Sequence, residues 1–565
     1  MNRNLGSALL ILLALLGVPV LLLARLPLAA LALLFLLILL LLLLLLPERK
    51  PAYRPEDYFV SDQVVVSGPL QAVTAVIAQL NQAKTHLREV RRVQVGTSNQ
   101  QLLDCLSGCF DITLDDFVII LYDISGSEAD VAAVLRAIQR AAGPGSGVTA
   151  SPNWITASPW QAVGSQFQAV GSPWQAVGSP WQAVGSPWQA VGSPWQAVGS
   201  TAGGEAQAAP AALFMGQWAF RNINLPARPA VRGSQVRIAL FDTSPIADAQ
   251  AQPGMTVTVS TVTAPAPLVI DPENPAPAAQ LAADPTAPDV RNHGIFAAGM
   301  AHAVAPGAEK ELIRVLANDN RGDLFTLNSA IFDFLNRTTG DNKPADLLGA
   351  VINLSLGIRL LPEEAGLGIP PEAQSLQLLL TAARCLGVVV VAAAGNNSAG
   401  LDVPVAANLP ANWPAVIGVA ASNGRDARAC FSNRGNIAAP GGDGRSAADA
   451  DCLPRLADCS GDCENAVIGP VIDANYPEGF IYWVGSSFAA PLVAGLAALV
   501  IERGGGQLSP RDVWRIIACA ARQTKDPALG AGIIDVGETL ARFDDCVRAL
   551  GIVLPGAADK EQISG

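Results

Sequence analysis

The chain has 565 residues and a formal net charge of −12, so it is long enough for several domains. The acidic balance argues against a nucleic-acid partner, because phosphate binding needs clustered Lys and Arg. Only three histidines are present, at His86, His293 and His302, so any histidine-dependent chemistry must use one of them. The nine cysteines lack zinc-ligand spacing with histidine, so we expect no metal site, while disulfide pairing and redox compartment stay open.

Residues 1–50 are expected to form a membrane anchor. Residues 5–46 are almost wholly apolar with an interruption at Arg25, which allows one or two transmembrane helices of about 20 residues. No small-residue cleavage site of a signal peptide follows them. The flanking basic residues favour a hairpin with both ends cytoplasmic, and the alternative is a single span with the rest of the chain on the other side.

The sequence pattern of residues 51–153 predicts a small α+β domain. The pattern reads strand, helix, strand, strand, helix and strand, an order typical of a ferredoxin-like sandwich. We place His86 on its surface, near the end of the first helix.

The composition of residues 154–210 predicts a low-complexity linker. Six tandem heptads of the form SPWQAVG fill residues 158–199, the second being SQFQAVG. Pro and Gly in the repeat forbid a continuous coiled coil. Five of the ten tryptophans lie in these heptads, so the linker could bind an unknown partner, although self-packing of the rings is the simpler interpretation.

The sequence pattern of residues 211–546 predicts an α/β domain, and residues 547–565 are expected to form a C-terminal tail. Val-, Ile- and Leu-rich strands alternate with helices, which is typical of a parallel β-sheet covered by helices on both faces. Two insertions, 246–289 and 442–478, are expected to be surface loops. Ligands of such sheets bind beyond the carboxyl ends of the strands.

Four polar residues fall at that edge. Asp242 ends a buried strand, His293 begins a helix, Asn396 follows another buried strand, and Ser487 begins a long helix of small residues. A hydroxyl nucleophile needs a base, the base needs an acceptor to orient it, and an amide donor can complete an oxyanion hole. Each residue alone could instead cap a turn or a helix, but four together at one edge predict a nucleophilic active site.

These residues lie in motifs that resemble the subtilisin-like serine proteases (subtilases). The motifs are VRIALFDTS at 236–244, NHGIFAAG at 292–299, AAAGN at 392–396 and GSSFAAPLVAG at 485–495, and the resemblance spans about 211–545. It implies that Asp242 orients His293, that His293 is the base, that Ser487 is the nucleophile and that Asn396 donates to the oxyanion. It also implies a substrate-binding strand and a specificity pocket formed by Ser355, Leu356, Gly357, Ala393, Ala394 and Gly395.

The resemblance implies further expectations for the rest of the chain. Residues 51–153 would be a pro-domain, and self-cleavage after it would release the protease from its anchor. The protease domain would be extracytoplasmic, acting on protein or peptide substrates without a required cofactor; structural calcium at the acidic loop near Asp462 is possible in this family but the sequence does not support it. Phe296 and Phe488 depart from the family's histidine and methionine.

Two other functions were weighed. A non-catalytic relative of the same fold could act as a membrane-tethered binding module through the tryptophan repeats, but no member of the triad is lost. An ester hydrolase would carry a Gly-x-Ser-x-Gly elbow, which is absent around Ser487. A membrane-anchored, self-processing serine endopeptidase is therefore the leading hypothesis.

Overall fold

The computed structural model describes residues 58–157, 209–244, 290–358, 372–443 and 461–554 with gaps of one or two residues, together with Cys452, Cys459 and strands β6 and β7. The chain divides into two compact units, Met1–Ala52 and Tyr53–Gly565, and all described residues belong to the second. The expected membrane anchor and the heptads lie outside the described residues. Within the described part, one helix is long and apolar enough to span a membrane, α13 (Ser486–Arg503), and 89% of its apolar window is buried inside the protein.

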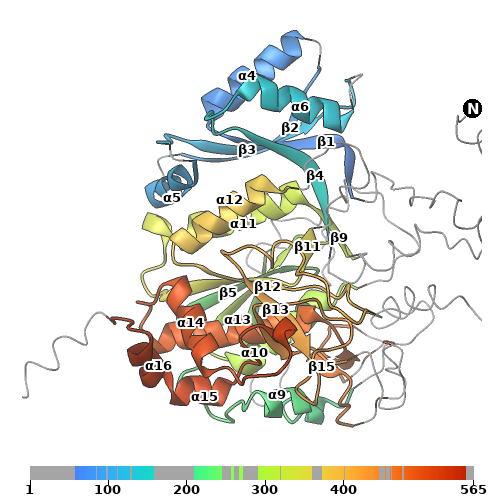
Figure 1. Ribbon diagram of the computed structural model, residues 1–565, viewed down its shortest axis with the longest axis vertical. Helices are drawn as coiled ribbons and strands as arrows, with labels where there is room; N and C mark the ends of the chain where they lie inside the picture. Colours follow the sequence, from blue (N-terminus) through green and yellow to red (C-terminus); the bar gives the residue numbers. More distant parts are fainter. Residues whose placement is uncertain are drawn as a thin grey trace, which may run out of the picture. The chain divides into compact units, whose positions relative to one another are not determined.

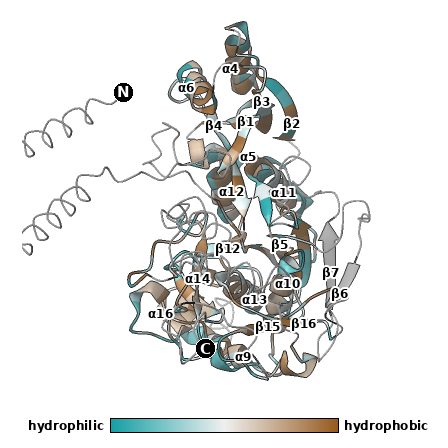
Figure 2. Cartoon of the chain, turned by 90° about the vertical axis from the view of Figure 1, so that its right-hand side faces the viewer, coloured by the Kyte–Doolittle hydropathy of each residue, from teal (hydrophilic) through white to brown (hydrophobic). Residues whose placement is uncertain are grey.

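An N-terminal domain forms the upper part of the described structure (Figure 1). Its antiparallel sheet has the order β4-β1-β3-β2, and the apolar faces of α4 and α6 pack on it. The exposed edge strand β2 is largely hydrophilic (Figure 2). In chain order its elements are β1 (Phe59–Gly68), α4 (Leu70–Gln82), β2 (Arg88–Val95), α5 (Gln100–Phe110), β3 (Phe117–Asp123), α6 (Val131–Ala142) and β4 (Thr149–Ala157).

Helix α5 is the element of this domain that the sequence analysis did not predict. It lies between β2 and β3, where the analysis expected two consecutive strands. Its apolar face is formed by Leu102, Leu103 and Leu106, which are all buried. The Asn99 side chain begins the helix by accepting a hydrogen bond from the Leu102 N–H at 3.0 Å.

The α/β domain contains an eight-stranded sheet of order β14-β13-β12-β10-β5-β8-β7-β6. All neighbouring strands are parallel except β6, which is antiparallel to β7. This arrangement confirms the predicted parallel α/β sheet. The expectation that the insertion 246–289 is a surface loop is wrong, because β6 and β7 lie within it and extend the sheet. Its strands are β5 (Val236–Asp242), β6 (Thr256–Val259), β7 (Ala266–Asp271), β8 (Glu309–Arg314), β10 (Gly349–Leu354), β12 (Val389–Ala393), β13 (Ile417–Ser422) and β14 (Ile437–Pro440).

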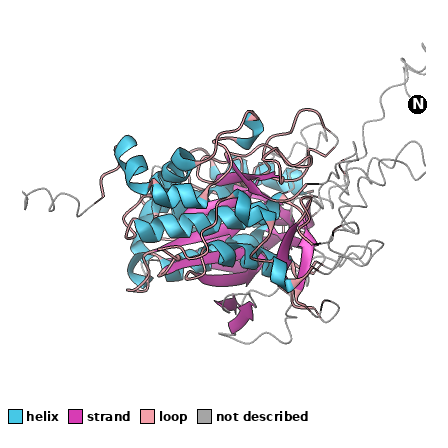
Figure 3. Cartoon of the chain, turned by 90° about the horizontal axis from the view of Figure 1, so that it is seen from below, coloured by secondary structure: helices cyan, strands magenta, loops and turns pink. Residues whose placement is uncertain are grey.

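Helices cover both faces of this sheet (Figure 3). Side chains alternate along β5, so that Ile238 and Leu240 enter the core with α10 and α13, whereas Ala239 and Phe241 enter the core with α11 and α12. The second core is continuous with that of the N-terminal domain.

The remaining elements are η5 (Ala211–Leu213), α9 (Trp218–Asn222), α10 (His293–Val304), β9 (Arg321–Asp323), α11 (Leu324–Thr338), η8 (Gly340–Asn342), β11 (Gly357–Ile358), α12 (Gln374–Cys385), the hairpin β15 (Val467–Pro470) and β16 (Phe480–Trp483), α14 (Pro510–Ala520), η11 (Pro527–Leu529), α15 (Val536–Ala541) and α16 (Phe543–Ala549).

Four disulfides occur within the described residues, and the sequence analysis left their pairing open. Three of them lie within the α/β domain, whereas Cys105–Cys385 joins it to the N-terminal domain. Cys109 is the free cysteine of this part of the chain. The bonds are Cys105–Cys385, Cys430–Cys452, Cys459–Cys463 and Cys519–Cys546.

Candidate active site

Asp242 and His293 are joined by a buried hydrogen bond. Strand β5 ends at Asp242 and helix α10 begins at His293, and 2.7 Å separates Asp242 Oδ1 from His293 Nδ1. Both side chains are fully buried. The backbone N–H of Thr243 donates to the same carboxylate oxygen at 2.7 Å, which fixes the carboxylate on the strand end.

A close approach of two backbones makes this pairing possible. A Cβ atom at Gly294 would lie 2.2 Å from the carbonyl oxygen of Thr243 and 3.0 Å from Asp242 Cβ. Only glycine lets the first turn of α10 come this close to the end of β5. The glycine of the Asn-His-Gly motif is therefore part of what brings His293 to Asp242.

Ser487 lies in the first turn of α13, at the same edge of the sheet. Its Oγ is 3.3 Å from the carbonyl oxygen of Ser355, and Ser355 Oγ in turn donates to the carbonyl oxygen of Ser487 at 2.6 Å. The ring of Phe488, the next residue, lies 5.1 Å from the His293 ring. The imidazole therefore lies beside the helix turn that carries the nucleophile.

Asn396 faces the same turn with its amide. Its Oδ1 accepts a hydrogen bond from the Ser486 N–H at 3.0 Å, and the Gly395 N–H donates to Ser486 Oγ at 3.1 Å. Asn396 Nδ2 is buried and donates to none of the described residues. Such an oriented, available amide donor is what an oxyanion hole requires.

The residues expected to bind substrate lie on both sides of Ser487. Ser355 and Leu356 follow β10, and Gly357 pairs as a strand with Ala157. Ala393 ends β12, and the backbone of Ala394 is held by a 2.9 Å hydrogen bond from its N–H to the Val419 carbonyl. Every predicted site residue therefore lies at the carboxyl ends of β5, β10 and β12 or in the turns of α10 and α13 beside them. These residues are Asp242, His293, Ser487, Asn396, Ser355, Leu356, Gly357, Ala393, Ala394 and Gly395.

The sequence analysis missed one wall of this site, strand β9. The last residues of β4 lie between β9 and β11 and pair antiparallel with both: Ile155 with Asp323, Thr156 with Gly322 and Ile358, and Ala157 with Arg321 and Gly357. Figure 1 shows β4 extending from the N-terminal domain to these two short strands. A three-residue strand that is completed only by a distant partner has no local periodicity, so no pattern around β9 predicts it beyond the helix-capping Asp323.

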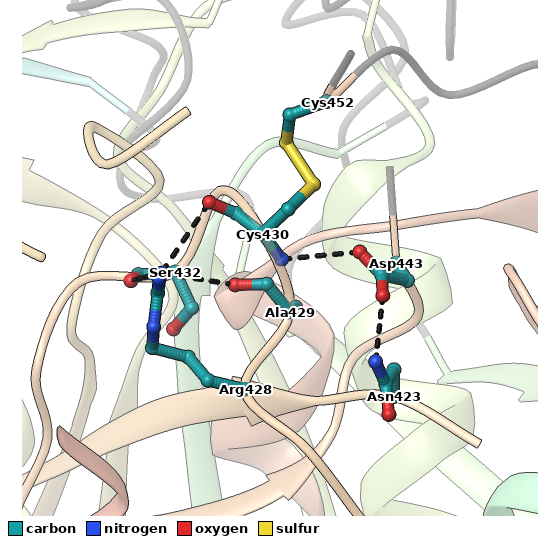
Figure 4. The surroundings of a disulfide bond; sticks show 7 residues. All are labelled: Asn423, Arg428, Ala429, Cys430, Ser432, Asp443 and Cys452. Carbon is teal, nitrogen blue, oxygen red and sulfur yellow. Dashed lines mark hydrogen bonds between the residues drawn. A yellow bond between two sulfur atoms is a disulfide. The ribbon is translucent and has the colours of Figure 1, made fainter. Parts of the chain in front are cut away.

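A buried carboxylate supports the turn that precedes Ser487 (Figure 4). Asp443 accepts from the Cys430 N–H at 3.0 Å and from Asn423 Nδ2 at 2.6 Å. Two residues earlier, the carbonyl oxygen of Gly441 accepts from the Gly485 N–H at 2.8 Å. The Cys430–Cys452 disulfide and Asp443 thus hold the loop against which the nucleophile turn is hydrogen-bonded.

The described residues contain no group of three or more His, Cys, Asp or Glu side chains that could hold a metal ion. Part of the acidic loop considered for calcium lies outside the described residues. Asp462, which is described, accepts from the Trp218 N–H at 2.9 Å and pairs with Arg221. Buried His302 lies in the last turn of α10, at the other end of the helix from His293, and His86 is exposed.

Comparison with known proteins shows which family this domain resembles. Residues 271–532 match the model of the subtilase family, Peptidase_S8. Over this range the chain is similar to the catalytic domain of subtilases. The matched range contains His293, Asn396 and Ser487, whereas Asp242 lies before it.

Curated relatives of the subtilase domain include two bacterial proteases. The thermophilic serine proteinase of Bacillus sp. (strain AK1) is 29% identical over 257 residues, which cover 43% of this chain and 49% of the relative. The extracellular protease of Xanthomonas campestris pv. campestris is 30% identical over 260 residues, covering 43% of this chain and 39% of the relative. The chain thus spans about half or less of the length of these curated relatives.

A solved structure supports the fold. Fervidolysin from Fervidobacterium pennivorans, a keratinolytic enzyme related to subtilisin, superposes with a TM-score of 0.51 at 16% identity, over 88% of this chain and 64% of that chain. At this identity the similarity concerns the fold alone.

Proposed function

We propose that the chain is a serine endopeptidase that hydrolyses peptide bonds through an acyl-enzyme. The observation that carries the proposal is the buried 2.7 Å contact between Asp242 and His293 beside the helix turn of Ser487. Ser487 Oγ attacks the substrate carbonyl carbon while His293 takes the hydroxyl proton, and Asp242 holds the imidazole in the required tautomer. His293 then returns the proton to the leaving amine, and water hydrolyses the acyl-enzyme by the same steps in reverse.

Asn396 Nδ2 would stabilise the negative charge that develops on the substrate carbonyl oxygen. The N-terminus of α13, whose first turn carries Ser487, adds the favourable field of the helix dipole. Neither the amide nor the dipole has to reorganise during the reaction, which is why such sites stabilise the transition state more than the ground state.

Protein and peptide substrates fit the walls of the site. β9 and β11 pair with the two edges of β4, which lies between them as the central antiparallel strand, and we take the space that β4 fills as the substrate groove. An extended peptide of a substrate would make the same backbone hydrogen bonds, so recognition would depend on backbone more than on side chains.

Self-processing is part of the proposal. Gly357, the partner of Ala157, follows Ser355 by two residues, and the Ser355 carbonyl lies 3.3 Å from Ser487 Oγ. The chain therefore occupies its own groove up to the approach to the nucleophile, and we place the cleavage within a few residues after Ala157. Residues 51–153, as a pro-domain, would block the groove until then.

We further propose that the enzyme acts from a membrane, with the subtilase domain on the extracytoplasmic side. The apolar run at 5–46 is long enough for one or two spans. Four disulfides in the described residues fit an oxidising compartment outside the cytosol.

The proposal is tested by comparing the full chain with Ser487→Ala in membranes. We expect wild type to hydrolyse an unfolded protein substrate and to yield two fragments on a reducing gel, and Ser487→Ala to do neither. Ser509→Ala is the matched control, because Ser509 is an exposed serine whose Oγ caps α14 by accepting a hydrogen bond from the Asp512 N–H. Hydrolysis without fragments would remove self-processing only, whereas inert wild type would remove the enzyme assignment.

A further inference from the structure

Two aromatic rings contact the imidazole of His293. The Trp483 ring lies 5.6 Å away at an interplanar angle of 84°, and the Phe488 ring lies 5.1 Å away at 48°. Trp483 ends β16 and Phe488 follows the nucleophile, so the contacts come from two separate elements.

Phe296 joins these two rings into one cluster, here named the aromatic box (Phe296, Trp483 and Phe488). Phe296 lies 4.3 Å from Phe488 and 5.6 Å from Trp483, and Trp483 lies 5.1 Å from Phe488. All three side chains are buried. Phe296 and Phe488 are two positions at which the sequence departs from the subtilase motifs, and the structure shows that the two departures are in contact.

The β15–β16 hairpin holds the aromatic box in place. A Cβ atom at Gly469 would lie 2.5 Å from the Phe296 ring, so the hairpin backbone rests directly on that ring. The Gln217 side chain fixes β15 from the other side: its Nε2 donates to the Ile468 carbonyl at 2.9 Å and its Oε1 accepts from the Ile468 N–H at 2.8 Å.

We propose that the aromatic box positions the imidazole of His293, so that its residues are positioning residues for the reaction; this rests on the proposed function. The hydrogen bond to Asp242 fixes one ring nitrogen but leaves the imidazole free to swing about that bond. Contacts from Trp483 and Phe488 remove this freedom and aim the other nitrogen toward the nucleophile turn. Misplacement of a catalytic group by about 1 Å can cost about 100-fold in rate.

The test uses the full chain and two variants that shrink the rings, Trp483→Leu and Phe488→Leu. We expect kcat on a peptide p-nitroanilide to fall by roughly 10- to 100-fold while KM changes little, since the groove walls are untouched. Trp483→Phe keeps an aromatic ring and should recover most of kcat. Labelling of Ser487 by phenylmethanesulfonyl fluoride should slow in parallel with kcat.

Phe220→Leu is the matched control, because Phe220 is buried in the same core and contacts Phe214, outside the aromatic box. It should reduce stability with little change in kcat per folded molecule. If the ring variants also lose activity only in proportion to their folded fraction, the positioning role is overturned while the endopeptidase assignment stands. Wild type that neither hydrolyses peptides nor takes the label would overturn both.

A second inference comes from the disulfide between the two domains. Cys105 lies on α5 of the N-terminal domain and Cys385 ends α12 of the subtilase domain, 280 residues later in the chain. Helices α5 and α12 lie side by side in both views of Figure 1 and Figure 2. The bond therefore spans the linker and the expected cleavage position.

We propose that the N-terminal domain stays covalently bound after self-cleavage; this also rests on the proposed function. Cleavage after Ala157 would break the backbone but not the Cys105–Cys385 bond, so the expected release of the protease from its anchor would not follow from cleavage alone. Release would need a dithiol reductant, which supplies two electrons: one thiolate attacks the bond, its second thiol resolves the mixed disulfide, and both cysteines become thiols. Cys385 is exposed, so such a reductant can reach the bond.

Gels of the full chain with and without reductant test this retention. We expect wild type to give two fragments only after reduction, whereas Cys105→Ser should give them without reduction. Cys109→Ser is the control: this cysteine lies one helical turn along α5, and the variant should behave as wild type. Fragments that separate from wild type without reductant would overturn retention and keep self-processing. If self-processing fails, retention is tested in Ser487→Ala with the recognition site of a specific added protease inserted at residue 200. After that protease cuts the chain, we expect the two fragments to separate only with reductant. Fragments that separate without reductant would overturn retention.

Discussion

Asn396 Oδ1 accepts a hydrogen bond from the Ser486 N–H at 3.0 Å, and this single contact sets the direction of the whole amide. Because one end of the amide is held, Nδ2 has to lie on the opposite side. A Cβ atom at Gly485 would lie 3.4 Å from that nitrogen, which places it against the turn before the nucleophile. The acceptor half of Asn396 is thus structural and the donor half is available for chemistry.

Asn396→Asp separates these two halves. An aspartate keeps the acceptor for Ser486 but replaces the donor with a second acceptor that repels a developing oxyanion. We expect kcat to fall by about 100- to 1,000-fold with little change in KM. Steady-state kinetics on a peptide substrate measure it, and unchanged kcat in a folded Asn396→Asp protein would show that this amide does not stabilise the transition state.

Asp242→Asn tests the orienting role of the carboxylate. The asparagine has nearly the same shape, but its amide can present an N–H toward His293 and so favour the wrong imidazole tautomer. We expect kcat to fall by about 10,000-fold. Stability should be followed in the same samples by urea unfolding, because the Thr243 N–H also depends on this side chain. A loss of less than about 10-fold in a folded variant would contradict the orienting role.

Local patterns were sufficient to predict the subtilase-type sheet and the placement of Asp242, His293, Asn396 and Ser487. Strand β5 ends at Asp242 as the sequence analysis predicted, since a continuous apolar run is encoded in neighbouring residues. The site residues follow from the rule that parallel strands share one carboxyl edge.

Features that depend on distant partners were not predictable in the same way. Strand β9 becomes a strand only by pairing with β4, more than 150 residues earlier. The Cys105–Cys385 pairing needs the docking of two domains, and nine cysteines allow many alternatives. The contact between Phe296 and Phe488 likewise depends on how α10 packs against α13, which spacing alone does not show.

Asp443→Ala tests the support of the nucleophile turn. Removing the carboxylate leaves the buried Cys430 N–H and the half-buried Asn423 amide without their acceptor. We expect the free energy of unfolding to fall by about 2–4 kcal/mol, because each unsatisfied buried group costs about 1–3 kcal/mol. Urea unfolding measures it. Asp512→Ala, which removes a more exposed carboxylate at the start of α14, is the control, and an equal effect of the two variants would contradict the role of Asp443.

Lys310 is a buried lysine at the other end of the sheet from the site. It lies in β8 with 2% of its surface exposed, and its Nζ donates to the carbonyl oxygens of Ala305 at 3.4 Å and Pro306 at 3.3 Å. Burial lowers the pKa of Lys310 to about 7, with a smaller contribution from the charge of Arg232. Lys310 is therefore easier to deprotonate in the folded protein than in the unfolded chain.

Lys310→Met should stabilise the protein in a pH-dependent way. The pKa of Lys310 is lower in the folded protein than in the unfolded chain, so its charge lowers the free energy of unfolding when it is protonated. This cost is absent above the unfolded-state pKa near 10.5, grows as the pH falls toward about 7, and is constant below that. We expect the variant to gain a few kcal/mol over wild type at pH 6, and about zero near pH 10.5 apart from packing. Urea unfolding of both proteins across this range measures the difference. Lys343→Met, at an exposed lysine, should show no such trend, and a gain at Lys310 that does not change with pH would contradict the buried charge.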